Sequence, residues 1–326
     1  MSAPVAALLL VGSFALTVAS SIVLARELDR LGERLGFSEA LLGIVTAIGA
    51  DAPEIASAIS ALVAGHEDTG VGVVVGSNVF NLAGLLGLSA LVAGPVRIHR
   101  HGLVLTGGVA VFVALIGTLV AVGTLPGLAG LLIALLVFAP YLVLSSLHSR
   151  TRARLPALLR EAVVEEQQDA RRDEFSRPAT AIDALAIVPA LAAVIGGAAG
   201  MVAAAQSLGD RWDVSDVVLG ALVLAALTSI PNLLAAVRLA LHGRGAACVS
   251  ESLNSNNANI LVGLCVPALV LGLGDPSGIE TFAAWAMVGM TALAVALGFG
   301  GGLTRREGSA IIALYAVFVA ILALAG

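Results

Sequence analysis

The sequence predicts an all-α polytopic membrane protein with ten transmembrane helices, arranged as two inverted-topology repeats of five. Of the 326 residues, 59% are hydrophobic and only 12% are charged, and the mean hydropathy is +1.01. Apolar runs of 18 or more residues recur along almost the whole chain, which is typical of membrane helices. The runs are continuous and do not alternate with polar residues, so they exclude a transmembrane β-barrel. One hydrophilic stretch divides them into two groups of five.

The ten expected membrane segments follow one another with short polar connections. In chain order they cover residues 3–25, 39–64, 70–94, 101–122, 126–147, 180–205, 213–240, 246–272, 279–300 and 307–325. The first lacks a basic start and a clear cleavage site, so we expect a membrane helix and not a removed signal peptide. The organisation is a first five-helix repeat over 1–147, a loop over 148–178 and a second five-helix repeat over 179–326. Because five is odd, the second repeat crosses the membrane in the opposite direction, as an inverted repeat requires.

The distribution of positive charge predicts the orientation. The chain has 17 arginines and no lysine. If the N-terminus lies outside the cell, every arginine except Arg211 falls on the cytoplasmic side, in agreement with the positive-inside rule. We therefore expect a multi-pass protein of the cell (inner) membrane with both termini extracellular or periplasmic. The loop over 148–178 is expected in the cytoplasm.

Two stretches of the chain repeat one pattern of polar residues. The first contains Pro53 and, 24 residues later, Ser77; the second contains Pro231 and, again 24 residues later, Ser255. Each stretch places a proline and polar side chains in the middle of apolar segments. Polar groups at such depth are unfavourable in lipid and mark transport pathways, so we expect a binding site near the membrane midplane.

Each proline is expected to kink its helix and to release one backbone carbonyl. Because proline has no N–H, Pro53 leaves the carbonyl of Gly49 without its helical donor, and Pro231 does the same for Leu227. A released carbonyl in lipid needs another partner. A bound cation is one such partner, so Gly49 and Leu227 are candidate carbonyl ligands.

Two carboxylates stand beside the first proline. Asp51 and Glu54 are three residues apart and share one helix face. A charged carboxylate at the bilayer centre is disfavoured by about 2.5–3.5 kcal/mol, and two of them repel each other. A cation or a proton relieves both effects, so we expect metal occupancy to be linked to protonation or to a competing ion. Arg238 is the nearest candidate counter-ion, but it is expected near the cytoplasmic end of its segment.

Hydroxyl and amide side chains accompany the prolines in both copies. These are hard oxygen ligands, suited to Ca²⁺ or Na⁺. The candidates are Ser77, Asn78 and Asn81 in the first copy and Thr228, Ser229, Asn232, Ser255, Asn256 and Asn259 in the second. Interhelical hydrogen bonding accounts for a single membrane asparagine, but less well for a cluster that recurs at matched spacing. Glu251, one turn before Ser255, is a candidate for the cytoplasmic entrance.

These motifs resemble those of the calcium/cation antiporter superfamily, in particular the sodium/calcium exchangers of bacterial or archaeal type. The family's two repeats carry G-T-S-x-P-E/D and, later, G-S-N-x-x-N. Residues 47–54 and 76–81 resemble the first repeat closely, and residues 228–232 and 255–261 resemble the second more loosely. The resemblance implies alternating access, with segments one and six sliding against a core of segments two, three, seven and eight. It also implies a cation bound by Glu54 with Ser77, Asn81, Thr228, Ser229, Ser255, Asn259 and the carbonyls of Gly49 and Leu227.

Three departures from the family pattern concern the charge and packing of the site. Asn232 stands where the second repeat usually has an acidic residue, Ala50 and Asp51 replace Thr-Ser, and Asn254 replaces the glycine before Ser255. We expect Asp51 to restore the missing carboxylate from the other side of the site. Ca²⁺ takes about six to eight oxygens, usually with more than one carboxylate. Two carboxylates and the surrounding amides can supply that set.

The function expected from these features is a secondary active antiporter that exchanges Ca²⁺ for Na⁺ or H⁺. Two alternatives remain: an antiporter for a monovalent cation or Mg²⁺ coupled to protons, and a passive cation channel. Channels usually line a pore with rings of ligands, whereas a single occluded midplane site indicates a carrier. An enzyme is not expected, because both carboxylates lie on one helix and the histidines form no zinc pattern. We expect inorganic cations and the lipid bilayer as partners, no cofactor, no nucleic acid and a functional monomer.

Overall fold

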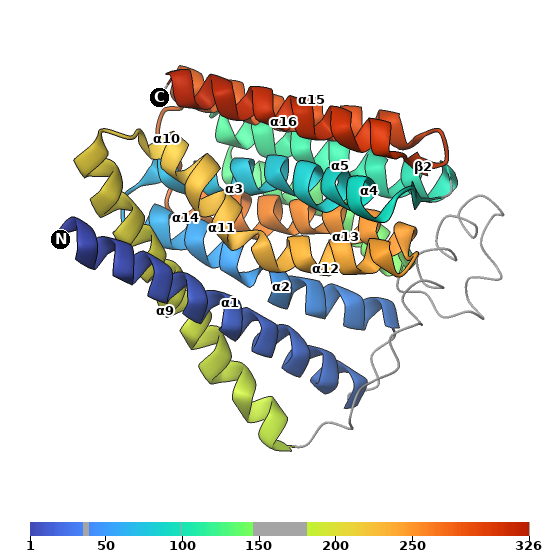
Figure 1. Cartoon of the computed structure of the whole chain (residues 1–326), viewed down its shortest axis with the longest axis horizontal. Helices are drawn as coiled ribbons and strands as arrows, with labels where there is room; N and C mark the ends of the chain where they lie inside the picture. The colour runs from blue at the N-terminus through green and yellow to red at the C-terminus, as the bar shows by residue number, and fades with distance from the viewer. Residues whose placement is uncertain (35–38, 99, 146–180, 326) are drawn as a thin grey trace.

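The computed structural model is a bundle of long helices with one small β-sheet (Figure 1). It describes residues 1–34, 39–98, 100–145 and 181–325, without the side chains of residues 33–34, 39–47 and 181–184. The expected loop over 148–178 lies outside the described residues. The first part contains α1 (Ala3–Arg34), α2 (Glu39–Val63), α3 (Glu67–Asn81), the π-helix η1 (Leu82–Leu88), α4 (Ser89–Ala93), β1 (Val96–Arg97), α5 (Arg100–Ala121) and α6 (Gly127–Ser145).

The part after residue 180 has a similar series of helices. Its elements are α9 (Ala181–Trp212), α10 (Asp216–Val218), the π-helix η2 (Leu219–Leu224), α11 (Ala225–Thr228), α12 (Ile230–Leu241), α13 (Gly245–Ala258), the π-helix η3 (Asn259–Cys265), α14 (Val266–Val270), α15 (Gly278–Gly298), β2 (Gly302–Leu303) and α16 (Arg305–Ala325). Apart from the two-residue strands β1 and β2, the described elements are helical. The prediction of an all-α membrane protein is therefore confirmed.

Eight helical runs among the described residues are long and apolar enough to cross a membrane. A ninth is obtained if α10–α11 and α12, which meet at 49°, form one broken span. These runs match nine of the expected segments; the remaining one, residues 39–64, forms the 25-residue helix α2. Two helices are longer than expected, because α1 and α9 each contain 32 residues.

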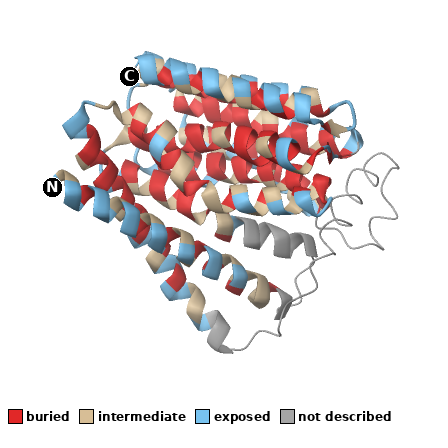
Figure 2. Ribbon diagram, viewed as in Figure 1, coloured by how far each residue is buried: buried red, intermediate tan, exposed pale blue. Residues whose placement is uncertain are grey.

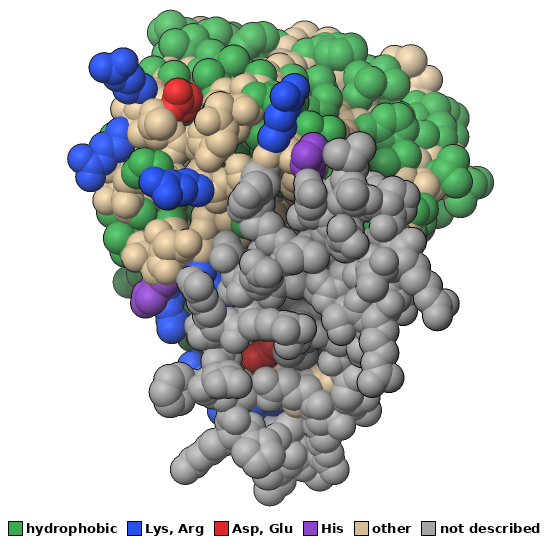
Figure 3. Space-filling model, turned by 90° about the vertical axis from the view of Figure 1, so that its right-hand side faces the viewer, with side chains coloured by type: hydrophobic (Ala, Val, Ile, Leu, Met, Phe, Trp, Pro, Cys, Tyr) green, Lys and Arg blue, Asp and Glu red, His purple; other side chains and the backbone are tan. Residues whose placement is uncertain are grey.

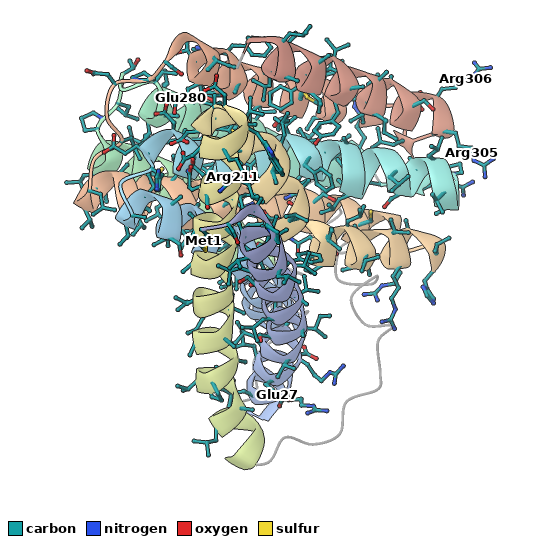
Figure 4. All side chains as sticks on the ribbon, turned by 60° about the vertical axis from the view of Figure 1, so that its left-hand side comes forward. Met1, Glu27, Arg211, Glu280, Arg305 and Arg306 are labelled. Carbon is teal, nitrogen blue, oxygen red and sulfur yellow. The ribbon has the colours of Figure 1, made fainter. Side chains whose placement is uncertain are left out.

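The helices α1 and α9 lie side by side along one flank of the bundle and are inclined to the other helices (Figures 1 and 4). Small residues permit this close contact. A Cβ atom at Gly197 would overlap the Thr17 hydroxyl, and one at Gly200 would overlap that of Ser13. The pair contacts the rest of the bundle chiefly through α2. Small-residue contacts of this kind bring membrane helices together without an apolar driving force.

The most buried helices, α3 and α13, run through the middle of the bundle (Figure 2). They pack on one another and on α2, α5, α12 and α15. The two runs also change geometry at corresponding places, since η1 begins directly after Asn81 and η3 begins at Asn259. A π-helix adds a residue to the turn and is frequent at functional sites. The regular α-helix therefore ends in both runs at an asparagine of the predicted site.

Charge is unequal at the two ends of the bundle. Several arginine side chains gather at the end that carries the β-sheet (Figure 3), where Arg305 and Arg306 lie (Figure 4). The strands there are antiparallel, with Val96 opposite Leu303. At the other end the Arg211 guanidinium donates a hydrogen bond to the Met1 carbonyl, with an N···O distance of 2.9 Å. We call these the sheet end and the Met1 end.

Toward the Met1 end, α3 packs directly on the backbone of η2. A Cβ atom at Gly76 would overlap the backbone of Ala221, and one at Gly220 would overlap that of Thr69. Glycine is therefore required at both positions for the two helices to approach so closely.

Polar contacts add to the packing of the helices at the Met1 end. The Thr69 hydroxyl donates to the carbonyl of Asp216 at 3.2 Å and accepts from Nε2 of Gln206 at 2.6 Å. The residue that corresponds to Gly76 in the second copy, 178 positions later, is Asn254. It is half-buried and donates to the Tyr141 hydroxyl at 3.0 Å. The close backbone packing that Gly76 allows in α3 therefore has no counterpart in α13, which carries an asparagine at the corresponding position.

Replacement of Gly76 by alanine tests this packing. Gly76→Ala should lower the free energy of unfolding by about 1–3 kcal/mol, because the new methyl group forces α3 and η2 apart. Thermal unfolding of the detergent-solubilised protein would measure the change. Gly108→Ala in α5 is the matched control, since a Cβ atom there meets no other atom within 4 Å. Equal stability of the two variants would contradict the described contact.

Candidate cation site

The polar side chains predicted for the site come together in the interior, where α2, α3, α11–α12 and α13–η3 meet. Each of them is at most 4% exposed. The set contains Asp51, Glu54, Ser77, Asn78, Asn81, Thr228, Ser229, Asn232, Ser255, Asn256 and Asn259. The structure therefore brings together residues that are up to 208 positions apart in the sequence.

The carboxylate of Asp51 is held by the second copy of the motif. Its Oδ1 accepts hydrogen bonds from the Ser255 hydroxyl at 2.6 Å and from Nδ2 of Asn232 at 2.8 Å. The other oxygen, Oδ2, is buried and accepts no hydrogen bond. One side of this carboxylate is therefore held in place while the other remains available as a ligand.

The carboxylate of Glu54 is surrounded by amides. Its Oε1 accepts from Nδ2 of Asn232 at 3.0 Å, and its Oε2 accepts from Nδ2 of Asn259. The Ser229 and Asn81 side chains also lie against this carboxylate. Asn232 thus donates to both acidic residues and stands between them.

Among the residues that the structure describes, no arginine pairs with either carboxylate. The ion pairs Arg30–Glu27 on α1 and His66–Asp216 near the Met1 end both lie outside the site. Asp51 and Glu54 are 2% and 1% exposed, respectively. Buried carboxylates without a counter-charge are strongly disfavoured, and hydrogen bonds from neutral amides compensate only in part. The site is therefore electrostatically suited to a cation or a proton.

Several buried oxygens around these carboxylates have no hydrogen-bond donor. They are Asp51 Oδ2, Ser77 Oγ, Asn81 Oδ1, Asn232 Oδ1 and Asn259 Oδ1. Buried acceptors are normally satisfied in folded proteins, so a group of them around two carboxylates fits a positively charged ligand. Carboxylate, hydroxyl and amide oxygens are the ligands preferred by Ca²⁺ and similar hard cations.

The two prolines have different effects on their helices. Pro53 lies inside α2, which continues from Glu39 to Val63 without a break. Before Pro231 the helix is interrupted at Ser229, between α11 and α12, with a bend of 49°. Neither proline can donate to the carbonyl four residues earlier. The predicted roles of Gly49 and Leu227 as carbonyl ligands remain predictions.

Thr228 and Glu251 lie at the edge of the carboxylate network. The Thr228 hydroxyl donates to the carbonyl of Leu224 at 2.9 Å, within its own helix, which leaves its oxygen able to accept. Glu251 is half-buried and sits one helical turn before Ser255, on the side of the sheet end. Glu251 therefore places one acidic side chain between the sheet end and the site.

The sequence did not predict two interhelical hydrogen-bonding residues, Gln206 and Tyr141. Gln206, which donates a hydrogen bond to Thr69 near the Met1 end, lies just beyond the expected end of the sixth segment. Tyr141 links Asn254 to Thr106 across α13, α6 and α5. Their signal in the sequence was a lone polar residue in an apolar run, which is common in membrane helices that only pack together.

Long apolar helices around a buried acidic centre define this protein as a multi-pass membrane protein with an acidic site in its interior. The sequence matches the sodium/calcium exchanger protein family over residues 5–148 and 183–324, and the chain belongs to that family. The predicted resemblance to calcium/cation antiporters is therefore confirmed.

Individual relatives agree with this assignment. The Escherichia coli (strain K12) inner membrane protein YrbG is 27% identical over 81% of this chain and 79% of its own length. The human sodium/potassium/calcium exchanger 4 is 33% identical over 34% of this chain, and the human exchanger 1 is 42% identical over 21%. These matches span only 20% and 6% of the two human proteins.

Two solved structures share the fold. The H⁺/Ca²⁺ exchanger CAX aligns with a TM-score of 0.72 at 13% identity, covering 97% of this chain and 85% of CAX. The sodium-calcium exchanger NCX_Mj aligns with a TM-score of 0.63 at 22% identity, covering 98% of this chain and 99% of the other. At these identities the likeness concerns the architecture.

The bridge made by Asn232 generates a stability prediction. Asn232→Asp should destabilise the cation-free protein, because two hydrogen bonds to charged groups, each worth about 1.5–3 kcal/mol, become contacts between acceptors. Millimolar Ca²⁺ should recover much of the loss, since a cation can bind between the carboxylates. Unfolding temperatures measured in chelator and in Ca²⁺ would test both statements. A variant as stable as the wild type in chelator would show that the bridge is unimportant.

Proposed function

We propose that this protein is a secondary active antiporter that exchanges Ca²⁺ for Na⁺ or H⁺ through the buried site at Asp51 and Glu54. The observation that supports it most is the group of unpartnered oxygens around two carboxylates without a counter-ion. Membership of the exchanger family, and CAX and NCX_Mj as structural relatives, agree with this function.

The ligand set favours a divalent cation. Asp51 and Glu54 supply two negative charges, and Ser77, Asn81 and Asn259 add neutral oxygens, a combination that suits Ca²⁺. The Asn232 amide donates to both carboxylates. A half-turn of that amide would present its unpartnered Oδ1 to an entering cation. Asn232 would then change from a donor to a ligand when a cation binds.

The protein is proposed to contain ten membrane helices in two inverted repeats of five, over 1–147 and 179–326. The bent run α10–α12 then counts as one span and α2 as another. Support comes from pairs of residues exactly one repeat, 178 positions, apart that contact each other. Asn232 donates to Glu54, and the side chains of Asn78 and Asn256 bond to each other's backbone. Contacts between corresponding residues are expected near the axis that relates two inverted repeats.

Alternating access would follow from the unequal closure of the two ends. The Met1 end is closed by glycine contacts between α3 and η2, whereas Glu251 and Asn254 are half-buried toward the sheet end. We propose that cations enter this state past Glu251, and that α1 and α9 move together against the core to reverse access. With the arginine-rich sheet end in the cytoplasm, both termini and the Met1 end face outward, and the loop over 148–178 faces inward.

Ion fluxes in proteoliposomes test the function directly. Radiolabelled Ca²⁺ should be taken up against an outward Na⁺ gradient or an outward H⁺ gradient, and the gradient that works identifies the coupling ion. Mg²⁺ and K⁺ added in excess would show whether another cation competes. Ca²⁺ movement that needs neither gradient would instead indicate a channel. Absence of Ca²⁺ uptake under both gradients would contradict the calcium exchanger.

The two carboxylates should both be essential. Glu54→Gln and Asp51→Asn should each reduce Ca²⁺ exchange about 100-fold or more, because each removes one of the two negative charges that the described residues place in this buried site. The measurement is the initial rate of gradient-driven uptake. Glu307→Gln, at a half-buried acid near the start of α16 and outside the site, is the control and should transport normally. Normal exchange by Asp51→Asn would show that Asp51 does not replace the second-repeat carboxylate.

A further inference from the structure

Asn78 and Asn256 form a reciprocal pair at the centre of the bundle. Nδ2 of Asn78 donates to the backbone carbonyl of Asn256 at 3.2 Å, and Nδ2 of Asn256 donates to the backbone carbonyl of Asn78 at 3.0 Å. Both side chains are at most 4% exposed. These two bonds fasten α3 to α13 at equivalent positions of the two copies.

The remaining oxygens of the same two amides are also used, in a crossed pattern. Oδ1 of Asn256 accepts from Nδ2 of Asn81 at 3.0 Å. Oδ1 of Asn78 accepts from Nδ2 of Asn259 at 3.3 Å. Each amide of the pair therefore holds the NH₂ group of an asparagine in the opposite copy.

This arrangement fixes the orientation of the Asn81 and Asn259 side-chain oxygens. A planar amide carries its oxygen and its NH₂ group on opposite sides, so fixing the NH₂ group fixes the direction of the oxygen. Oδ1 of Asn81 and Oδ1 of Asn259 are both buried and without a donor. Asn81 and Asn259 also lie against the Glu54 carboxylate. Because the Asn259 NH₂ group, and not its oxygen, contacts Glu54, the two free oxygens are held in fixed directions near the acidic pair without facing the Glu54 carboxylate.

We propose that Asn78 and Asn256 are positioning residues that do not bind the transported cation. Asn256 holds Asn81, and Asn78 holds Asn259, so that each carbonyl oxygen is presented to the cation before it arrives. This differs from the sequence-based prediction that all four asparagines are ligands. The inference rests on the proposed function as a cation carrier.

The crossed pattern has a consequence for how the two halves cooperate. Each ligand asparagine is oriented by the half of the protein to which it does not belong. The complete ligand set therefore forms only when α3 and α13 are in register, which the backbone bonds of the pair ensure. Groups that orient a ligand in this way typically change metal affinity about 10–100-fold when removed.

Double-mutant cycles on cation affinity test the proposal. The variants are Asn78→Ala, Asn81→Ala, Asn256→Ala and Asn259→Ala, with all pairwise combinations. Two quantities are measured: the KM for Ca²⁺ in gradient-driven uptake, and the Ca²⁺-induced rise in the unfolding temperature of the purified protein. The second reports binding without transport. The unfolding temperature in chelator monitors any purely structural damage.

Coupling is expected across the crossed pairs, and not between the two asparagines of one helix. Asn256→Ala should raise KM about 10–100-fold, and adding Asn81→Ala should raise it no more than about threefold further, because the orientation of that ligand is already lost. Asn78→Ala and Asn259→Ala should behave likewise. The pairs within one helix, Asn78 with Asn81 and Asn256 with Asn259, should have effects that multiply.

Asn257→Ala is the matched control, because Asn257 is a fully buried amide of the same helix whose Nδ2 bonds to Asn254. It should leave the KM for Ca²⁺ unchanged. Multiplicative effects in the crossed pairs, or equal coupling in crossed and same-helix pairs, would overturn the proposal while leaving the carrier function intact. So would variants that lower stability in chelator without changing the Ca²⁺-induced rise. A wild-type protein that neither binds nor transports a cation would overturn the proposed function and this inference together.

Discussion

Two buried carboxylates without a counter-charge are the constraint on which the rest of the structure depends. Asp51 and Glu54 lie on one face of α2, in the interior of a protein built for lipid, and no described arginine pairs with either. Hydrogen bonds from neutral amide groups stabilise the two carboxylates. Asn232 and Asn259 donate to these carboxylates, and Ser255 holds one oxygen of Asp51. Neutral donors lower the electrostatic cost only partly, which leaves the site with an affinity for positive charge that transport can use.

The two copies of the motif agree in geometry and differ in charge and packing. The 178-residue offset relates Glu54 to Asn232, and these two side chains contact each other. An acid at position 232 would place three carboxylates together, whereas the Asn232 amide donates hydrogen bonds to the other two. Gly76 and Asn254 differ in a comparable way, since one permits backbone contact and the other occupies that space with a polar side chain. In the proposed carrier, the first difference would affect which ion binds, and the second would affect the side from which the ion enters.

Much of this could be predicted from the sequence, because the strongest signals were local. Apolar length identified the membrane helices, and the spacing from Pro53 to Ser77, repeated from Pro231 to Ser255, identified the residues that converge. Less could be predicted where the outcome depends on contacts between helices. That α2 continues through Pro53 while the second copy breaks at Ser229 depends on packing that the motif does not encode. The crossed bonds of Asn78 and Asn256 likewise join residues 175 to 181 positions apart. The spacing of the motif predicted both as ligands and could not distinguish a ligand from a residue that orients one.

The most direct test of the central claim is to locate a bound cation. Crystals of the protein soaked in Sr²⁺, whose anomalous scattering identifies the ion, should show it between the Asp51 and Glu54 carboxylates. Its ligands should include the free oxygens of Asn81 and Asn259, at distances somewhat longer than the roughly 2.3–2.6 Å typical of Ca²⁺, and the Asn232 amide should no longer bridge the two acids. An ion found elsewhere in the bundle, with the Asn232 bridge intact and the carboxylates unligated, would contradict the account.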